Sequence, residues 1–215
     1  FREFLTWIIE VEKQFLIIGS MNAITYKDIF PLIKNDKMWL GNGFDAGNAY
    51  FSTPFNKEYA DGVYNPDTGL VKFRNVCWLT NLDHGRRHQP LRLMTMADNL
   101  KYSKHKGIQG KKSYDRYDNY DALEVPFTDA IPSDYDGVMG VPISFLDKYC
   151  PEQFEIVGIT KTWFGSATKI YPPQIQVSSK GQMSNVTKLN DGATLKLDSP
   201  PHGQTYYIVD NEFYT

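Results

Sequence analysis

Helical and strand-like patterns alternate over the first forty residues, and this alternation constrains the fold more than any other feature of the chain. Apolar residues in 1–12 recur at helical spacing with glutamates opposite, which predicts an amphipathic helix. The apolar residues 15–20 predict a parallel strand covered on both faces. A capping pattern at 25–28 predicts the start of a second helix, and residues 38–40 predict the next strand. This order favours part of an open doubly wound α/β sheet.

Two segments after this alternation carry candidate functional residues. Residues 41–69 are rich in Gly, Asn and aromatic side chains, and we expect an irregular connection of a length that tends to be functional. Within it, a turn at 65–69 predicts a hairpin between 62–64 and 70–73. Residues 76–82 predict a strand. The polar side chains that follow it would lie at one edge of the sheet, where they form either a surface that binds a polyanion or a turn exposed to solvent. These side chains are Asp83, His84, Arg86, Arg87 and His88.

The formal net charge of −2 hides a strong asymmetry along the chain. Residues 84–116 hold nine Lys or Arg against two acidic residues, whereas residues 117–136 hold six acidic residues and no Lys or Arg. Basic side chains can neutralise phosphates and release counterions, so the basic stretch favours nucleic-acid binding over a merely solvated face. We expect residues 91–116 to be weakly periodic and mobile. The candidate contacts are Arg86, Arg87, His88, Arg92, Lys101, Lys104, Lys111 and Lys112.

Other chemistries find less support in the sequence. Residues 39–43, Trp-Leu-Gly-Asn-Gly, resemble a glycine turn for a nucleotide or S-adenosylmethionine, but Gly47 and Pro54 disfavour the helix that should follow. Residues 199–202, Ser-Pro-Pro-His, resemble the catalytic loop of amino methyltransferases with His in place of an aromatic, and a Pro-rich turn is the simpler interpretation. We expect no metal site, because His84 and His88 lack a second ligand pair.

The composition, 41% hydrophobic and 14% aromatic, fits one large domain or a domain with a subdomain. We expect no signal peptide, and the sequence has no apolar run of about 18 residues that could span a membrane. Cys77 and Cys150 form no paired motif, so we expect a cytoplasmic protein. After residue 143, short apolar runs predict a β-rich region, with strands at 154–160, 169–171, 175–177, 194–197 and 206–209.

Several segments, taken together and in order, resemble EcoRI-type adenine-specific DNA methyltransferases of restriction–modification systems. The resemblance extends nearly from end to end, and it is specific as a set although each segment is weak alone. The matching segments are Phe15-Leu-Ile-Ile, Asn22-Ala-Ile-Thr-Tyr-Lys, Met38-Trp-Leu-Gly, Cys77-Trp-Leu-Thr-Asn-Leu-Asp-His, Tyr117-Asp-Asn-Tyr-Asp, Asp134-Tyr-Asp-Gly-Val-Met-Gly-Val-Pro-Ile-Ser-Phe-Leu-Asp-Lys-Tyr, Pro151-Glu-Gln-Phe-Glu-Ile-Val-Gly-Ile-Thr-Lys-Thr-Trp, Lys188-Leu-Asn-Asp-Gly and Thr205-Tyr-Tyr.

The resemblance implies the C-terminal part of a Rossmann-like methyltransferase sheet (1–90) followed by a basic linker and a β-rich DNA-recognition region (91–215). The intact enzyme would transfer a methyl group from S-adenosylmethionine to a flipped-out adenine in double-stranded DNA. In the family, the cofactor turn and the Asn-Pro-Pro-Phe catalytic loop precede the segment that starts here. We therefore expect no catalytic residue in 1–215, cofactor binding mainly upstream of Phe1, and no activity of this segment alone.

An aromatic side chain between the last two strands of related methyltransferase sheets helps to hold the flipped base. Here the corresponding interval is 41–69, and its candidates are Phe44, Tyr50 and Phe51. We expect a monomer. Two alternatives stay open, a non-catalytic nucleic-acid-binding module that uses only the basic patch, and an unrelated small-molecule enzyme that uses the glycine turn after Leu40.

Overall fold

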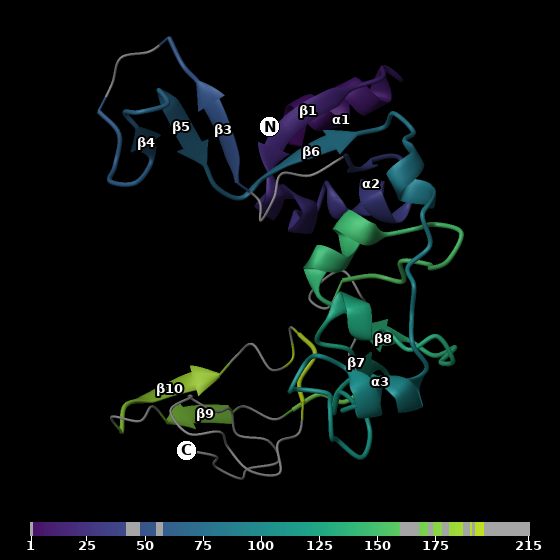
Figure 1. Cartoon of the computed structure of the whole chain (residues 1–215). Coiled ribbons are helices and arrows are strands. Elements are labelled where there is room, and N and C mark those ends of the chain that lie inside the picture. Colours follow the sequence, from purple (N-terminus) through teal and green to yellow (C-terminus); the bar gives the residue numbers. More distant parts are fainter. Residues whose placement is uncertain are drawn as a thin grey trace. The chain divides into compact units, whose positions relative to one another are not determined.

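The structure is a computed structural model that describes residues 2–41, 48–54, 58–159, 168–171, 174–177, 181–186, 190 and 192–195. The chain divides into two compact units, which Figure 1 shows with their elements labelled. Unit 1 comprises Phe1–Pro90 and Ser144–Ile156, and unit 2 comprises Leu91–Ile143 and Val157–Thr215. Segment 144–156 therefore returns to unit 1 from the middle of unit 2. No helix in the described ranges is long and apolar enough to cross a membrane.

Unit 1 is built on a three-stranded sheet with the order β1-β6-β2. Its strands are β1 (Leu16–Ser20), β6 (Val76–Thr80) and β2 (Trp39–Leu40). Both β1 and β2 are antiparallel to β6, so they run in the same direction on its two sides. The helix α1 (Arg2–Glu10) precedes β1, and η1 (Met21–Thr25) and α2 (Phe30–Lys34) connect β1 to β2. The predicted first helix and all three of these predicted strands are confirmed.

Two predictions for these elements are wrong. β1 is not covered on both faces by the described chain, because Leu16 and Ile18 are exposed and its one partner strand is antiparallel. The pattern at 25–28 does not start the second helix, since Thr25 ends η1 and its hydroxyl donates to the Asn22 carbonyl. α2 begins later because Pro31 is tolerated only in a first helical turn.

A second, smaller sheet occupies the connection between β2 and β6. It consists of β3 (Ala49–Ser52), β5 (Leu70–Phe73) and β4 (Tyr64–Asn65) in the antiparallel order β3-β5-β4, and we call it the small sheet. The predicted hairpin is confirmed by the pairing of Tyr64 with Val71. The expectation that 41–69 is irregular is wrong, because β3 and β4 are regular. Asn65 stabilises the hairpin turn, since its side-chain oxygen accepts the Asp67 N–H at 2.9 Å.

Unit 2 contains the helix α3 and four short strands among its described residues. α3 (Met96–Tyr102) begins where the Thr95 hydroxyl accepts the Asp98 N–H at 3.1 Å. β7 (Leu123–Glu124) and β8 (Met139–Gly140) are parallel, whereas β9 (Gln174–Val177) and β10 (Met183–Val186) are antiparallel. Residues 91–116 thus contain a helix that we did not predict, because the pattern Thr95-x-x-Asp98 starts a helix there, whereas the expected mobility of this segment stays a prediction.

Asn119 ties three segments of unit 2 together from a fully buried position. Its amide nitrogen donates to the Gly192 carbonyl and its amide oxygen accepts the Thr194 N–H, both at 2.7 Å. Its backbone carbonyl accepts from both the N–H and the hydroxyl of Thr168. A buried amide with all these partners fixes the chain around it. The stretch 117–121 that resembled the family is therefore structural in this unit.

The strands predicted after residue 143 have different outcomes in the structure. β9 confirms the strand predicted at 175–177. The described residues of 154–160 and 169–171 form no strand, and Leu195 makes only an isolated bridge with Tyr117. Residues 196–197 and 206–209 lie outside the described residues, as does the Ser-Pro-Pro-His sequence at 199–202. Short apolar runs of this kind form strands only where a partner strand is available, which their own sequence does not show.

Candidate functional site

The reversed direction of β6 decides which segment lies at which end of the unit 1 sheet. Ser20, at the carboxyl end of β1, pairs with Val76 at the start of β6, whereas Leu16 pairs with Thr80 at its end. The segment after β6 therefore lies at the amino ends of β1 and β2. Figure 1 shows the small sheet at the start of β6 and the basic segment after its arrowhead. In open α/β sheets ligands bind outside the carboxyl ends of the parallel strands, so the small sheet lies at the end where ligands are expected.

Gly41 follows β2 at this carboxyl end and belongs to the glycine turn considered for a cofactor. Its N–H donates to the Trp78 carbonyl at 2.9 Å, and a Cβ atom on Gly41 would lie only 2.9 Å from the Trp78 Cβ. Close packing of β2 against β6 thus explains this glycine without a ligand. Asn42 and Gly43 lie outside the described residues.

The aromatic candidates of 41–69 occupy different faces of the small sheet. Tyr50 is 56% exposed, stands opposite Lys72, and has the Lys72 ammonium 5.8 Å from its ring centroid. Phe51 is on the other face and packs edge-on against Phe73, with 5.6 Å between ring centroids. Phe44 lies outside the described residues. Tyr50 is therefore the more accessible of the two described candidates, and the stacking role of all three stays a prediction.

The opposite end of the sheet carries the 3₁₀ turn η3 (Gly85–His88), which we call the basic turn. Its two arginines both meet acidic side chains within unit 1. Arg86 forms an ion pair of 2.5 Å with Asp147, and Arg87 forms one of 2.6 Å with Asp36. The Arg87 guanidinium also lies 3.9 Å from the Trp39 ring centroid, a cation–π contact. These side chains fasten 144–156 and the start of β2 to the turn.

His88 completes the basic turn with two carboxylate partners. Its Nε2 lies 2.7 Å from Asp83 and its Nδ1 lies 2.5 Å from Glu152. Hydrogen bonds to Asp83 and then to Glu152 raise the pKa of His88, because both nitrogens can donate only in the charged imidazolium. The pKa of Asp83 is lowered by its bond with His88. The hydrogen bonds from Cys150 and then His88 lower the pKa of Glu152 to about 2.

The next candidates are the other histidine of this region and the cysteine in β6. His84 makes a contact within the fold, since its Nε2 lies 3.0 Å from the Leu40 carbonyl oxygen and can donate a hydrogen bond to it. Within the part of the chain that the structure describes, no group of three or more His, Cys, Asp or Glu side chains could hold a metal ion. Burial raises the pKa of the Cys77 thiol to about 11, so this cysteine is an unreactive core residue.

The remaining basic candidates belong to unit 2, where their surroundings differ. Lys104 pairs with Asp129 at 2.6 Å, and Lys111 pairs with Asp115 at 2.5 Å. Arg92, Lys101 and Lys112 are exposed and form no ion pair with another described residue. The structure therefore separates the eight candidates into paired and unpaired groups, and their role as DNA contacts stays a prediction.

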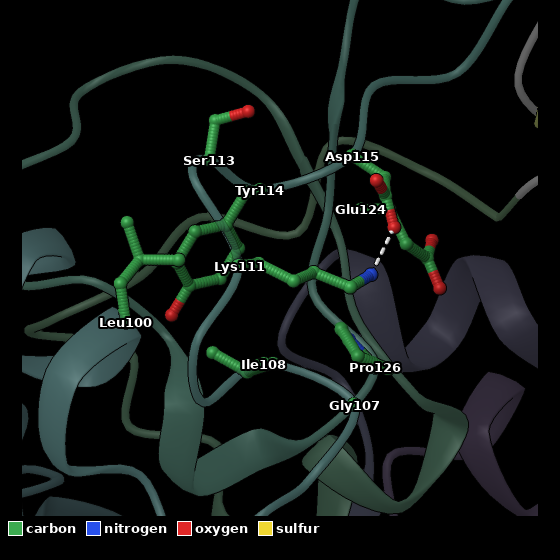
Figure 2. A pocket seen from close by; sticks show the side chains of 9 residues that line it. All are labelled: Leu100, Gly107, Ile108, Lys111, Ser113, Tyr114, Asp115, Glu124 and Pro126. Carbon is green, nitrogen blue, oxygen red and sulfur yellow. Dashed lines mark hydrogen bonds and ion pairs between the residues drawn. The ribbon is translucent and has the colours of Figure 1, made fainter.

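A small pocket lies beneath the paired Lys111 in unit 2. It is lined by Leu100, Gly107, Ile108, Lys111, Ser113, Tyr114, Asp115, Glu124 and Pro126, and its volume of about 10 Å³ holds roughly one water molecule. Figure 2 shows Lys111 reaching across it to Asp115, with Glu124 beside them. Burial and the charge of Asp115 raise the pKa of Glu124. The pocket is too small for a nucleoside or a cofactor.

The structure also reveals neighbours of the candidate residues that the sequence did not indicate. Asp36, Asp147 and Glu152 neutralise the basic turn, although they lie 51 to 64 residues from their partners. No local spacing could have found them. Lys72, opposite Tyr50, was missed as well, although strand alternation within the predicted hairpin could have placed it on one face.

Comparison with known proteins gives consistent matches along the chain. A family model described as "Adenine-specific methyltransferase EcoRI" matches residues 1–207. The chain is 43% identical over 164 residues to Type II methyltransferase M.EcoRI of Escherichia coli, covering 75% of this chain and 47% of that relative. It is 31% identical over 195 residues to Type II methyltransferase M.MgeORF184P of Mycoplasma genitalium, covering 86% of this chain and 57% of that relative.

A third relative, Type II methyltransferase M.MpnI of Mycoplasma pneumoniae, is 30% identical over 190 residues. The match covers 86% of this chain and 56% of that relative. The chain thus spans about half the length of these curated relatives. No solved structure gives a significant match.

Proposed function

Since this chain belongs to the EcoRI family of adenine-specific methyltransferases, we propose that it is part of a DNA adenine-N6 methyltransferase of a restriction–modification system. The observation that carries this proposal is the family match over residues 1–207. The full-length enzyme would transfer a methyl group from S-adenosylmethionine to adenine in double-stranded DNA. The family match does not favour the alternative of a non-catalytic nucleic-acid-binding module.

Within this proposal, unit 1 is one side of a Rossmann-like catalytic sheet. Two strands that run the same way, joined by a helical connection, form the repeating unit of such sheets. Mixed sheets with a reversed strand are common among doubly wound folds, and here the reversed strand β6 lies between the two parallel strands β1 and β2.

The open side of β1 supports a larger sheet. Leu16 is 56% exposed on β1 and Trp7 is 55% exposed on α1, and Phe4 and Ile18 are also exposed. Large apolar side chains on consecutive elements, beside a strand whose second edge has no partner among the described residues, mark a surface that another segment covers. The chain spans about half the length of its relatives, so we assign this surface to the part of a family-length protein that the chain does not include.

The described residues do not fit S-adenosylmethionine by themselves. At the carboxyl ends of β1 and β2 they offer Ser20, Asn22 and Gly41, of which Gly41 is explained by packing against Trp78. No partnerless buried polar atom of the described side chains belongs to these three residues. We therefore propose that the cofactor is bound mainly by other parts of the family-length protein, together with the catalytic loop.

The small sheet is proposed to help hold the flipped adenine. It lies at the carboxyl end of the parallel strands, and Tyr50 exposes a ring there with Lys72 beside it. Stacking of one base on an aromatic ring contributes roughly 1–3 kcal/mol. In the family-length enzyme, Tyr50→Ala should lose about that much flipped-base stability with an unchanged melting temperature. Fluorescence of 2-aminopurine at the target position measures this loss. Phe51→Ala should instead lower the melting temperature, because Phe51 packs against Phe73.

The activity itself is tested by transfer of a labelled methyl group to duplex DNA, followed by identification of the methylated base. A family-length protein that contains residues 1–215 should yield N6-methyladenine. Residues 1–215 alone should give no transfer above a no-protein control. Failure of the family-length protein to methylate adenine would contradict the proposal, and transfer by 1–215 alone would overturn the assignment of cofactor and catalytic loop to other parts.

A further inference from the structure

Residues 100–112 of unit 2 form a closed, strongly basic loop, which we call the lysine loop. The Gly110 N–H donates to the Leu100 carbonyl at 2.9 Å and closes it. The loop contains five lysines and one histidine and no acidic residue. Its positive charge is therefore concentrated on a short segment, of which residues 100–110 are closed by this hydrogen bond and Lys111 and Lys112 follow directly.

Buried side chains hold the lysine loop in place from the inside. Ile108 and Ser103 are almost fully buried. The His105 ring stacks on Phe127 with 3.7 Å between centroids, and its Nε2 lies 2.7 Å from Asp129. The lysines thus project from a backbone that is already ordered, so binding a ligand would cost little additional backbone entropy.

Only some of these lysines have a counterion within the protein. Asp129 neutralises Lys104 and Asp115 neutralises Lys111. Lys101, Lys106 and Lys112 are exposed and form no ion pair in the described part of the chain. A lysine without a carboxylate partner can neutralise a phosphate without first breaking an existing ion pair.

The basic turn of unit 1, in contrast, has no basic side chain that lacks a carboxylate partner. Arg86, Arg87 and His88 each contact at least one carboxylate, and the Arg87 side chain is only 12% exposed. A phosphate could recruit these side chains only by displacing Asp147, Asp36 or Glu152, which would leave a carboxylate beside the DNA.

We propose that the lysine loop contacts the DNA phosphates through Lys101, Lys106 and Lys112, and that the basic turn takes no part in DNA binding. This inference rests on the proposed function, because it names the residues by which such an enzyme would hold its duplex. Its physical basis is the presence or absence of an internal carboxylate partner.

The test compares two variants of residues 1–215 that remove the same charge, Lys101→Gln with Lys106→Gln and Arg86→Gln with Arg87→Gln. Binding to a short duplex is measured by fluorescence anisotropy over a series of salt concentrations. The lysine variant should flatten the salt slope by about 1.8 units and weaken binding at about 0.1 M salt roughly tenfold to a hundredfold. The arginine variant should keep the wild-type slope, and Arg86→Gln alone replaces it if the double variant does not fold.

Four other results are informative. If the arginine variant flattens the slope as much as the lysine variant, or if the lysine variant leaves the slope unchanged, this inference is overturned while the proposed function stands. If wild-type protein binds the duplex without salt dependence, the inference fails as well. Absence of adenine methylation by the family-length protein is the separate result that would remove the proposed function.

Discussion

Arg86, Arg87 and His88 of the basic turn each meet an acidic side chain, whereas three of the five lysines in the lysine loop meet none among the described residues. In sequence the two segments look alike, as basic runs after an apolar stretch. The acidic partners of the turn come from 51 to 64 residues away. A local excess of positive charge therefore predicts a basic segment without showing whether its charges are available to a ligand.

The direction of β6 is a second reason to assign the basic turn a structural role. Because β6 is reversed, the turn lies at the amino ends of β1 and β2, and in the Rossmann-like sheet that we propose, ligands would bind at the other end. The small sheet lies at the other end and exposes Tyr50. The basic turn fastens the returning segment 144–156 to unit 1, and we expect the following experiments to show that it is a structural feature.

The largest effect is expected from Phe145→Ala, which loosens the segment that carries Asp147 and Glu152. Phe145 is 7% exposed and packs edge-on against Tyr149 and Phe154. Its truncation should lower the free energy of unfolding of the chain by about 3–5 kcal/mol, because it removes a buried aromatic ring and leaves a cavity. Urea unfolding measures the loss. Phe4→Ala is the control, since its exposed ring should cost less than about 1 kcal/mol. Equal losses would contradict the account.

A smaller effect distinguishes the two basic segments directly. Arg87→Ala removes a mostly buried guanidinium that contacts both Trp39 and Asp36, and should lower the free energy of unfolding by about 1–3 kcal/mol. Lys101→Ala, its counterpart in the lysine loop, should change it by less than about 0.5 kcal/mol. Thermal and urea unfolding of the two variants provide the comparison. A larger loss for Lys101→Ala than for Arg87→Ala would reverse the assignments.

The smallest effect is the pH dependence that His88 gives to unit 1. Its pKa is raised in the folded protein, so its stabilisation is complete below the unfolded value of about 6.5 and is lost as the pH rises through the folded pKa. The lowered pKa of Glu152 acts oppositely, and its contribution is lost as the pH falls from about 4.5 toward 2. His88→Gln should therefore remove part of the fall in melting temperature above about pH 6.5. Lys101→Gln should retain that fall, and an unaltered profile for His88→Gln would contradict the prediction.

Much of unit 1 could be predicted because its signals are local. The helical spacing of 1–12, the apolar run at 15–20 and the turn Asn65-Pro-Asp-Thr-Gly each determine an element within a few residues. The exposed residues of β1 could not be predicted, because the apolar sequence of a strand does not show whether one or both of its faces are covered. Pro31 moved the start of α2, which shows that one residue can override a capping pattern.

The candidate site was less predictable than the fold. Tyr50 and Phe51 were found from composition, but only the strand register shows that they lie on opposite faces of the small sheet. The basic residues were found from charge, but their counterions Asp36 and Asp147 are distant in sequence. The helix α3 was missed although Thr95 and Asp98 have the spacing of a capping box.

The central claim is that the lysine loop, and not the basic turn, presents its charge to DNA. Amide chemical-shift mapping of residues 1–215 during titration with a short duplex tests it most directly, because both segments are observed in one sample. We predict shifts at residues 100–112 that diminish with added salt, and none at Gly85–His88. Shifts concentrated in the basic turn, with the lysine loop unchanged, would contradict the account.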